Sequence, residues 1–515
     1  MIDIAKKFYI TTAIDYVNSK PHLGHAYEKT LADVLARWHR LKGEDVLFLT
    51  GTDEHGRKIE KAAQNESKDP QKFVDEVTEH FRKLCKVLNI SNDDFIRTTE
   101  KRHIDVVIEI FKKVLKKQEI YKGFYEGLYC TSCENYYTEA ECPDGKCPIH
   151  KTSLEYLKEE SYFFKLSKYK EKILDYIEEN ESFILPETRK NELVNRLQDG
   201  LKDLSVSRTS VKWGIPLPND TNHVQYVWFD ALLNYVSALE YPGKKFKKYW
   251  PADVQVIGKD IIWFHTVIWP AILLAAGIKL PKTVYVHGFI TKNGEKLSKT
   301  LGIAIDPFHL VEKYGSDALR YFLIRSAPTG EDVDYTEEAL IKRINSELAD
   351  DLGNLVNRVL VLVEKNFHGK VPKPSKKISK TLTKEHADFY TRITTNVPKA
   401  VEASIEKYQF HNALNDIWFL IGEANKFVNN TKPWEIDDKE KLATVLYDLL
   451  EILRFIAILL YPFLPETSEK ILNYIGWNKR PRLKDLKWKL LKPETKTRKG
   501  EILFKKIEYG EQKVY

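Results

Sequence analysis

Two short motifs, far apart in the chain, carry side chains that suit a phosphate-rich ligand. Residues 21–25 read PHLGH and place two imidazoles beside a glycine. Residues 296–300 read KLSKT and place two lysines around a serine, with Gly294 and Gly302 on either side. Imidazole, ammonium and hydroxyl groups all make hydrogen bonds to phosphate oxygens. The two motifs together therefore predict one triphosphate that is held from two sides.

The first motif is expected where a helix begins. Pro21 suits the first position of a helix, and the apolar spacing of residues 31–38 continues the helical pattern. His22 and His25 are three residues apart and would share one face, at the end where the helix dipole is positive. Gly24 has no side chain, so it would let a nucleotide lie against the backbone.

A cysteine-rich segment predicts a metal site. Cys130 and Cys133 are three positions apart, and Cys147 and His150 repeat this spacing. Two such knuckles supply four ligands for one tetrahedral zinc ion, and a filled set of four indicates a structural site. Ordinary reduced cysteines are the alternative, but they leave the equal spacing unexplained. Cys142 has no partner at this spacing and is interpreted as a spare.

The elements that must position these groups alternate between strand and helix. Residues 8–13 and 45–49 read as strands around the first helix, and residues 253–258 and 283–287 resume the strand pattern. Ligands of such α/β sheets bind beyond the carboxyl ends of the strands. Residues 118–224, rich in Tyr, Cys, Lys and Glu, interrupt the alternation. We therefore expect a sheet assembled from two segments of the chain.

The second half of the chain has a different pattern. Residues 338–474 read as amphipathic helices of a bundle. A basic tail follows them, and residues 502–507 are a candidate strand near its end. An α/β region followed by a helical bundle is the expected architecture.

Charge and hydropathy narrow the class of protein further. The chain has 81 Lys and Arg against 74 Asp and Glu, a net charge of +7. This excess fits a nucleic-acid partner, although a lysine-rich soluble surface explains it equally well. No apolar run reaches the roughly 18 residues of a transmembrane helix, and the N-terminus lacks a signal-peptide pattern. We therefore expect a cytoplasmic protein without a membrane-spanning segment.

The two phosphate motifs resemble the HIGH and KMSKS signatures of class I aminoacyl-tRNA synthetases. Within that class the chain is similar to the methionyl-tRNA synthetase family nearly throughout. Supporting segments, in chain order, are AIDY (13–16), GTDEHG (51–56), YVWFDA (226–231), GKD (258–260), LGNLVNR (352–358) and KPW (432–434). Leu297 and Thr300 replace the Met and Ser of the second signature, and Leu232 stands where many members have Pro. None of these departures removes a group that the chemistry needs.

The resemblance implies a Rossmann-type α/β catalytic domain with a zinc-binding insertion, followed by an all-α anticodon-binding bundle. Six regions follow from it. They are the first catalytic half (1–117), the connective insertion with the zinc knuckle (118–224), the second catalytic half (225–305), a stem-contact linker (306–337), the anticodon-binding domain (338–480) and a basic C-terminal tail (481–515). The insertion is too short for a separate editing domain.

The implied activity joins L-methionine to ATP, giving methionyl-adenylate and pyrophosphate, and then transfers methionine to the terminal adenosine of tRNA(Met) for initiation and elongation. Mg²⁺ would accompany ATP. The implied ATP-binding residues are His22, Gly24, His25, Lys259, Asp260, Lys296, Ser298 and Lys299, of which His22, His25, Lys296 and Lys299 are assigned to catalysis.

The resemblance also implies an amino-acid pocket. Asp53 would pair with the substrate ammonium, and aromatic rings would surround the thioether. His265 or Tyr16 would offer a hydrogen bond near the sulfur. The implied methionine-binding residues are Ile14, Tyr16, Asp53, Trp228, Ala231, Leu232, Tyr235, Phe264, His265 and Trp269. Because one methylene is worth only about 1–3 kcal/mol in such a pocket, homocysteine should compete.

For tRNA, the resemblance assigns the CAU anticodon to Asn354, Arg358 and Trp434. Asn354 and Arg358 are four residues apart and would share a helical face. An amide and a guanidinium suit the edges of unstacked bases, and an indole offers a stacking plane. The β-barrel domain that many members append is absent from the sequence, which predicts a monomer.

Three other interpretations fit parts of the sequence. The first is a sister class I synthetase for Leu, Ile, Val or Cys, but the branched-chain enzymes carry a larger insertion. The second is a catalytically silent relative that only binds tRNA, although both imidazoles and both lysines are intact. The third is a zinc-dependent nucleic-acid-binding or scaffold protein, which would not need the pair of ATP motifs.

Overall fold

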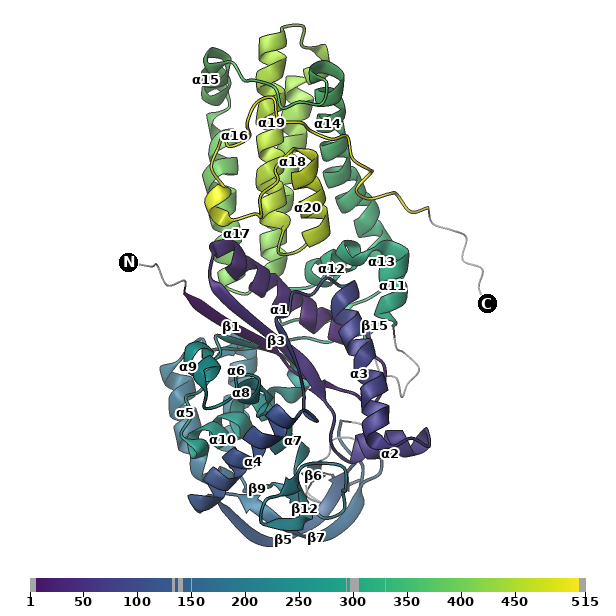
Figure 1. Cartoon of the computed structure of the whole chain (residues 1–515), viewed down its shortest axis with the longest axis vertical. Helices are drawn as coiled ribbons and strands as arrows, with labels where there is room; N and C mark the ends of the chain where they lie inside the picture. Colours follow the sequence, from purple (N-terminus) through teal and green to yellow (C-terminus); the bar gives the residue numbers. More distant parts are fainter. Residues whose placement is uncertain are drawn as a thin grey trace.

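A parallel β-sheet forms the centre of the N-terminal part of the molecule (Figure 1). The computed structural model describes residues 6–131, 135–137, 142–149, 151–292, 294–296, 305–328 and 330–508. The strand order is β2–β3–β1–β13–β14–β8, with β4 beside β3. The strands are β1 (Lys7–Thr12), β2 (Asp15–Tyr16), β3 (Asp45–Asp53), β4 (Asp94–Arg97), β8 (Ile184–Leu185), β13 (Val254–Gly258) and β14 (Val284–His287).

Helices cover both faces of this sheet because its strands alternate apolar side chains between two hydrophobic clusters. Phe8 and Ile10 of β1 belong to the cluster that contains α1 and α3, whereas Tyr9 belongs to the cluster that contains α4 and α10. The helices are α1 (Leu23–Lys42), α2 (Arg57–Asn65), α3 (Pro70–Val87), α4 (Lys101–Lys116), α9 (Lys244–Tyr249) and α10 (Trp269–Ala276). The expected α/β fold is confirmed.

The segment expected as an insertion forms an antiparallel sheet of its own and contributes to the central one. The order of its main sheet is β6–β5–β7–β9, and a smaller sheet has the order β10–β12–β11. The β8 strand, which lies between the helices α5 and α6, pairs in parallel with β14 at the edge of the central sheet. The elements are β5 (Ile120–Cys130), β6 (Asn135–Tyr137), β7 (Glu155–Phe164), α5 (Lys170–Glu179), α6 (Glu187–Gln198), β9 (Leu204–Ser205), β10 (Ser207–Arg208), β11 (Pro216–Leu217) and β12 (Asp220–Gln225).

A bundle of helices follows the sheet and shares a hydrophobic core with the α1 face (Figure 1). Its central helix is α19 (Lys439–Leu460), in which every residue from Leu442 onward is buried. The other elements of this half are α11 (Pro307–Tyr314), α12 (Ser316–Arg325), α13 (Glu337–Arg343), a π-helical stretch (Ile344–Gly353), α14 (Asn354–Phe367), α15 (Lys376–Glu385), α16 (Ala387–Thr391), α17 (Val397–Glu406), α18 (Phe410–Thr431) and α20 (Pro465–Tyr474). Among the described residues, no helix is both long and apolar enough to cross a membrane.

Arg320 of α12 joins the sheet to the bundle. Its guanidinium is fully buried and lies 2.8 Å from the carboxylate of Asp33 on α1. It also donates hydrogen bonds to the carbonyls of Phe463 and Pro462, at 2.9 Å each, and to that of Leu88 at 3.1 Å. The corner between α19 and α20 is therefore fixed against α1 by buried polar contacts as well as by apolar packing.

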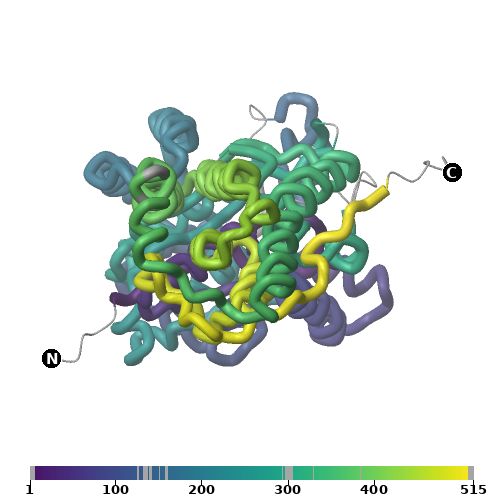
Figure 2. Tube along the Cα trace, turned by 90° about the horizontal axis from the view of Figure 1, so that it is seen from above, coloured from purple at the N-terminus to yellow at the C-terminus, as the bar shows by residue number. Residues whose placement is uncertain are grey.

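The C-terminal segment runs over the bundle without forming a strand, and Figure 2 shows its path across the helices. The expected strand at residues 502–507 is wrong. The segment lies along helices whose backbone groups are already bonded, so it meets no free sheet edge. A few backbone hydrogen bonds hold its middle, such as that from the N–H of Val371 to the carbonyl of Thr495 at 2.8 Å. Side chains hold other parts: Asn345 exchanges two hydrogen bonds with the backbone of Ile507, and Arg454 donates to the carbonyl of Lys487 at 2.5 Å.

Candidate functional site

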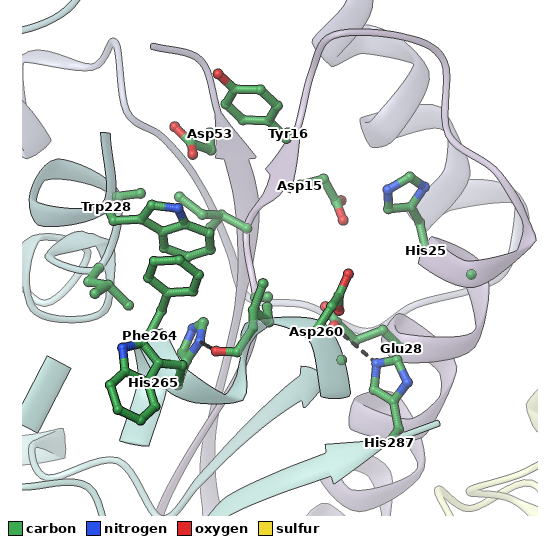
Figure 3. A pocket seen from close by; sticks show the side chains of 18 of the residues that line it. Asp15, Tyr16, His25, Glu28, Asp53, Trp228, Asp260, Phe264, His265 and His287 are labelled. Carbon is green, nitrogen blue, oxygen red and sulfur yellow. Dashed lines mark hydrogen bonds and ion pairs between the residues drawn. The ribbon is translucent and has the colours of Figure 1, made fainter. Parts of the chain in front are cut away.

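A cavity of about 820 Å³ opens at the carboxyl ends of the central strands (Figure 3). Its lining includes Ala13 after β1, Asp53 at the end of β3, Gly258 at the end of β13 and His287 at the end of β14. This is the edge at which a parallel sheet flanked by helices binds its ligands. The cavity is therefore the candidate active site.

The amino-terminal end of α1 forms one wall of the cavity. The helix begins at Leu23, two residues later than Pro21 predicted, because His22 acts as its N-cap. The His22 ring accepts a hydrogen bond from the backbone N–H of Gly24 at 3.1 Å, and the His25 ring accepts one from the backbone of His22 at 3.0 Å. The two rings stack with their centroids 3.9 Å apart.

The position of the His22 ring requires a glycine at residue 24. A Cβ atom at this position would lie 2.9 Å from Cε1 of His22, closer than such contacts tolerate, so the imidazole would have to move. His22, Gly24 and His25 all line the cavity. The structure therefore places the two imidazoles and the positive end of the helix dipole at the same wall.

The residues predicted to bind methionine gather in the same cavity, with one exception. Ile14, Tyr16, Asp53, Trp228, Ala231, Leu232, Tyr235, Phe264 and His265 all line it. Trp269 does not. It is fully buried behind the lining, and its indole N–H donates to Gln255 at 3.2 Å. Its ring lies 5.8 Å from that of Tyr235, so it supports the wall from behind.

The aromatic wall is built from two short elements. Trp228 belongs to α7 (Val227–Ala231), and Phe264 begins a π-helical turn (Phe264–Ile268) that leads into α10. The two rings stack with centroids 3.8 Å apart and planes inclined by 8°. Figure 3 shows this stack across the cavity from His25, with Asp53 beside its upper end.

His265 is a buried, neutral imidazole. Its Nδ1 donates to the carbonyl of Ile261 at 3.0 Å, and its Nε2 accepts from the hydroxyl of Tyr235 at 2.7 Å. Burial lowers its pKa to about 4. Both ring nitrogens are thus used within the protein. The Tyr16 hydroxyl likewise donates to the carbonyl of His55 at 3.0 Å, so neither predicted sulfur partner presents a spare N–H or O–H in this structure.

Lys259 and Asp260, which follow β13, lie in different surroundings. Asp260 lines the cavity. Lys259 does not, because its ammonium lies 2.7 Å and 2.9 Å from the two carboxylate oxygens of Asp332 and over the ring of Phe289. The structure brings Asp260, but not Lys259, to the cavity that His22, Gly24 and His25 line.

Two charged contacts in the cavity wall were not predicted from the sequence. Glu28 of α1 accepts a hydrogen bond from His287 at 3.2 Å, and burial raises the pKa of its carboxyl. Asp15 pairs with the buried ammonium of Lys29. A signal existed for the first contact, since Glu28 lies one turn beyond His25 on the same helix face and His287 ends a predicted strand. No pattern in the sequence predicts the ion pair between Asp15 and Lys29.

The second phosphate motif lies largely outside the described residues. The backbone of Lys296 belongs to β16 (Glu295–Lys296), which pairs with β15 (Ile290–Lys292). Ser298 and Lys299 fall outside the described ranges. Ile290 lines the cavity, so the hairpin that leads into the motif starts from the cavity wall.

Two of the four predicted metal ligands are described. Cys130 ends β5, Cys147 lies in the turn that follows β6, and both side chains are buried. The Cys147 turn is tight, because its N–H bonds the carbonyl of Thr152 at 2.8 Å and its carbonyl accepts from Lys151 at 2.8 Å. Cys133 and His150 lie outside the described residues. Buried thiols on tight turns fit a zinc knuckle.

The predicted anticodon residues meet on the surface of the bundle. Asn354 begins α14, and Arg358 lies one turn further along it. Arg358 donates to Asn429 at 2.9 Å, and its guanidinium lies over the Trp434 ring at 5.4 Å. Trp434 is 52% exposed in a short helix that begins at Pro433. An exposed indole beside an amide and a guanidinium is a surface that single-stranded bases can stack on.

Comparisons with known proteins show which family this chain belongs to. The family model for tRNA synthetases of class I (M) matches residues 8–156 and 143–360, and the model for the anticodon-binding domain of tRNA ligases matches residues 391–509. The chain is 48% identical over 511 residues to the methionine–tRNA ligase of Caldanaerobacter subterraneus, covering 98% of this chain and 79% of that protein. It is 48% identical over 484 residues to that of Rickettsia felis, covering 92% and 93%.

Solved structures agree with these relatives. Mycobacterium tuberculosis methionyl-tRNA synthetase in complex with methionyl-adenylate superimposes with a TM-score of 0.92 at 39% identity, over 97% of this chain and 99% of that one. Its apo form superimposes with a TM-score of 0.85 at 36% identity. The chain therefore belongs to the class I tRNA synthetases. Within that class it is a methionine–tRNA ligase, which attaches methionine to tRNA.

The depressed pKa of His265 predicts a pH-dependent contribution to stability. Between about pH 4 and 6.5 the unfolded chain binds a proton at this ring and the folded chain does not. The contribution of the neutral ring to the free energy of unfolding is fully present above about pH 6.5. As the pH falls toward 4, the free energy of unfolding decreases by up to about 3 kcal/mol because of this ring. In thermal melts, the melting temperature of the wild type minus that of His265→Gln should decrease as the pH is lowered through this range. A difference that stays constant with pH would contradict the assignment.

Proposed function

We propose that the cavity joins methionine to ATP and forms methionyl-adenylate. A carboxylate oxygen of methionine would attack the α-phosphorus, the bond to the β-phosphate would break, and pyrophosphate would leave. The observation that carries the proposal is that one cavity holds an acidic group at Asp53, an aromatic slot around Trp228 and Phe264, and the histidine-capped end of α1. These groups match an ammonium, a thioether and a phosphate in turn.

The amino-acid end of the site is proposed to work by charge and shape. Asp53 is 8% exposed and lies at the end of β3, where it would pair with the substrate ammonium. The stacked rings and the neutral His265 would surround the side chain. Because both nitrogens of His265 are already bonded, the slot would favour an uncharged, polarizable sulfur over a side chain that requires strong hydrogen bonds.

The nucleotide end is proposed to work by positioning and by stabilising negative charge. His22 and His25 would meet the phosphates at the start of α1, Gly24 would admit the adenosine, and Asp260 would face the ribose. Lys296, Ser298 and Lys299 would close on the triphosphate, an assignment that rests on the sequence motif. Because Lys259 does not line the cavity, it would affect the nucleotide only indirectly, through its ion pair with Asp332. The use of ATP by this class implies Mg²⁺, which would neutralise part of the phosphate charge.

Methionine-dependent exchange of pyrophosphate into ATP, run with all twenty amino acids, tests the proposal. Exchange is expected with methionine above all others. Asp53→Asn should lower kcat/KM for methionine by about 30-fold or more, the cost of leaving a buried charge unpaired. Asp69→Asn is the matched control, because Asp69 caps α3 away from the cavity and Asn also caps helices. Equal effects of the two variants, or preference for another amino acid, would overturn the pocket assignment.

We further propose that Asn354, Arg358 and Trp434 read the CAU anticodon. Trp434→Ala should raise the KM for tRNA(Met) about 5-fold to 100-fold, the worth of one stacked base, and should leave pyrophosphate exchange unchanged. Phe419→Ala is the control, since Phe419 is another exposed ring of the bundle, 49% exposed on α18. If both variants weaken charging equally, the loss is not specific to the anticodon residues.

We also propose that Cys130, Cys133, Cys147 and His150 hold one structural zinc ion. Zinc analysis of the purified protein should give one ion per chain. Cys147→Ser should lose the metal, because one of four ligands is removed, whereas Cys142→Ser should keep it. Retention of zinc by Cys147→Ser, or its loss from Cys142→Ser, would refute this ligand set. A cytoplasmic location and a monomeric state stay predictions from the sequence.

A further inference from the structure

A buried carboxylate with two imidazole partners lies directly behind the cavity wall. Oδ2 of Asp230 lies 2.7 Å from Nδ1 of His55, and its Oδ1 lies 2.7 Å from Nε2 of His103. Asp230 and His103 are fully buried, and His55 is 5% exposed. These three residues do not line the cavity. They come from three segments that are far apart in the chain, so the carboxylate joins the segments.

His55 connects this carboxylate to the acidic side of the cavity. It lies two residues after Asp53, in the loop that follows β3. Its carbonyl accepts the hydrogen bond from the hydroxyl of Tyr16. The same loop is held from the other side by Trp213, which donates to the carbonyl of Glu54 at 2.6 Å. The orientation of the His55 imidazole therefore helps to set where Asp53 and Tyr16 stand.

Asp230 lies on the aromatic side. It belongs to α7, two residues after Trp228, whose ring stacks on Phe264. His103 approaches from α4, which contributes no residue to the cavity lining, and its other ring nitrogen lies 2.8 Å from the hydroxyl of Ser237. The second imidazole thus anchors Asp230 to a helix of the scaffold.

The energetics favour a fixed geometry. Burial alone raises the pKa of the Asp230 carboxyl, but its contacts with His55 and His103 outweigh burial and hold that pKa below its ordinary value. A buried carboxylate with a donor at each oxygen is rigid, whereas removal of one donor leaves a desolvated oxygen without a partner. A displacement of α7 against the β3 loop would therefore strain the bond to His55, and a displacement of α7 against α4 would strain the bond to His103.

We propose that Asp230 is a positioning residue for the methionine reaction, which keeps the acidic wall and the aromatic wall of the pocket at a fixed separation through His55 and His103. The inference rests on the proposed assignment of this cavity to methionine. It adds a specificity role to three residues that touch no substrate. The ammonium of methionine would meet Asp53 and its thioether would meet the neighbouring aromatic stack, so the separation of these two parts of the pocket would select for the length of the side chain.

Steady-state pyrophosphate exchange with His55→Ala and His55→Asn tests this role. Asn carries an N–H near the position of Nδ1, so it can restore the bond to Asp230, whereas Ala cannot. His55→Ala should raise the KM for methionine about 10-fold, the worth of one hydrogen bond to a charged group. The KM for ATP should change less than about twofold, and His55→Asn should recover most of the loss. His103→Ala breaks the other bond and carries the same test if His55→Ala does not fold.

A purely structural role would give a different pattern. His223→Ala is the matched control, because His223 is also a buried histidine, bonded to Ser207 at 3.0 Å, but lies in the insertion away from the cavity. It should lower the melting temperature without changing either KM. The proposal is overturned if His55→Ala leaves the KM for methionine unchanged, or if it raises the KM for methionine and for ATP equally.

Asp53→Asn, assayed in the same series, separates failure of this inference from failure of the pocket assignment. If Asp53→Asn raises the KM for methionine and folded His55→Ala does not, only the positioning role is lost. If Asp53→Asn leaves that KM unchanged, the cavity is not the methionine pocket and the positioning role falls with it.

Discussion

Three buried charges determine how the two halves of this enzyme meet. Asp33 and Arg37 lie one turn apart on α1, and Arg320 enters from α12. Burial raises the pKa of Asp33, but the two guanidinium groups outweigh burial and hold it below its usual range. Buried charges are costly unless each keeps its partners, so this cluster permits one arrangement of α1 against the bundle. The same helix presents His22 and His25 to the cavity. One helix, about 30 Å long, therefore belongs to both the wall of the cavity and the interface with the bundle (Figure 1).

The cavity separates two chemical environments by means of backbone topology. His22, His25 and Asp53 come from elements that precede the insertion, whereas Trp228 and Phe264 come from α7 and the π-helical turn, which follow it. The two sets are far apart in the chain and meet because β13 pairs with β1 in the centre of the sheet. Polar contacts behind the lining then hold them in place. The strand order thus brings the two sets of side chains into one cavity.

The helices, the strands and the first phosphate motif could be predicted from local signals in the sequence, whereas the residues of the amino-acid pocket are implied only by the family resemblance. The spacing of His22 and His25, the apolar periodicities of the helices and the ends of the strands all lie within short windows. Other features could not be predicted, and three of them show why. The helix starts at Leu23 because a histidine side chain replaces the usual cap. Lys259 is drawn from the cavity by Asp332, and Asp230 meets two histidines. Each depends on a side-chain contact between residues that are close together only in the folded chain, or on a cap that common preferences do not favour.

The π-helical turn at Phe264–Ile268 has a consequence for changes in chain length. Such a turn accommodates one more residue than regular α-helix, and here it leads directly into the buried helix α10. A one-residue deletion inside α10 would rotate the part of the helix that follows the deletion by about 100°. The apolar side chains of that part would then turn away from the core. Deletion of Phe264 or His265 inside the π-helical turn would restore ordinary α-helix and leave α10 facing the core, but it would remove a side chain that lines the cavity. At this turn, a shorter chain would keep the packing of α10 and change the lining of the cavity.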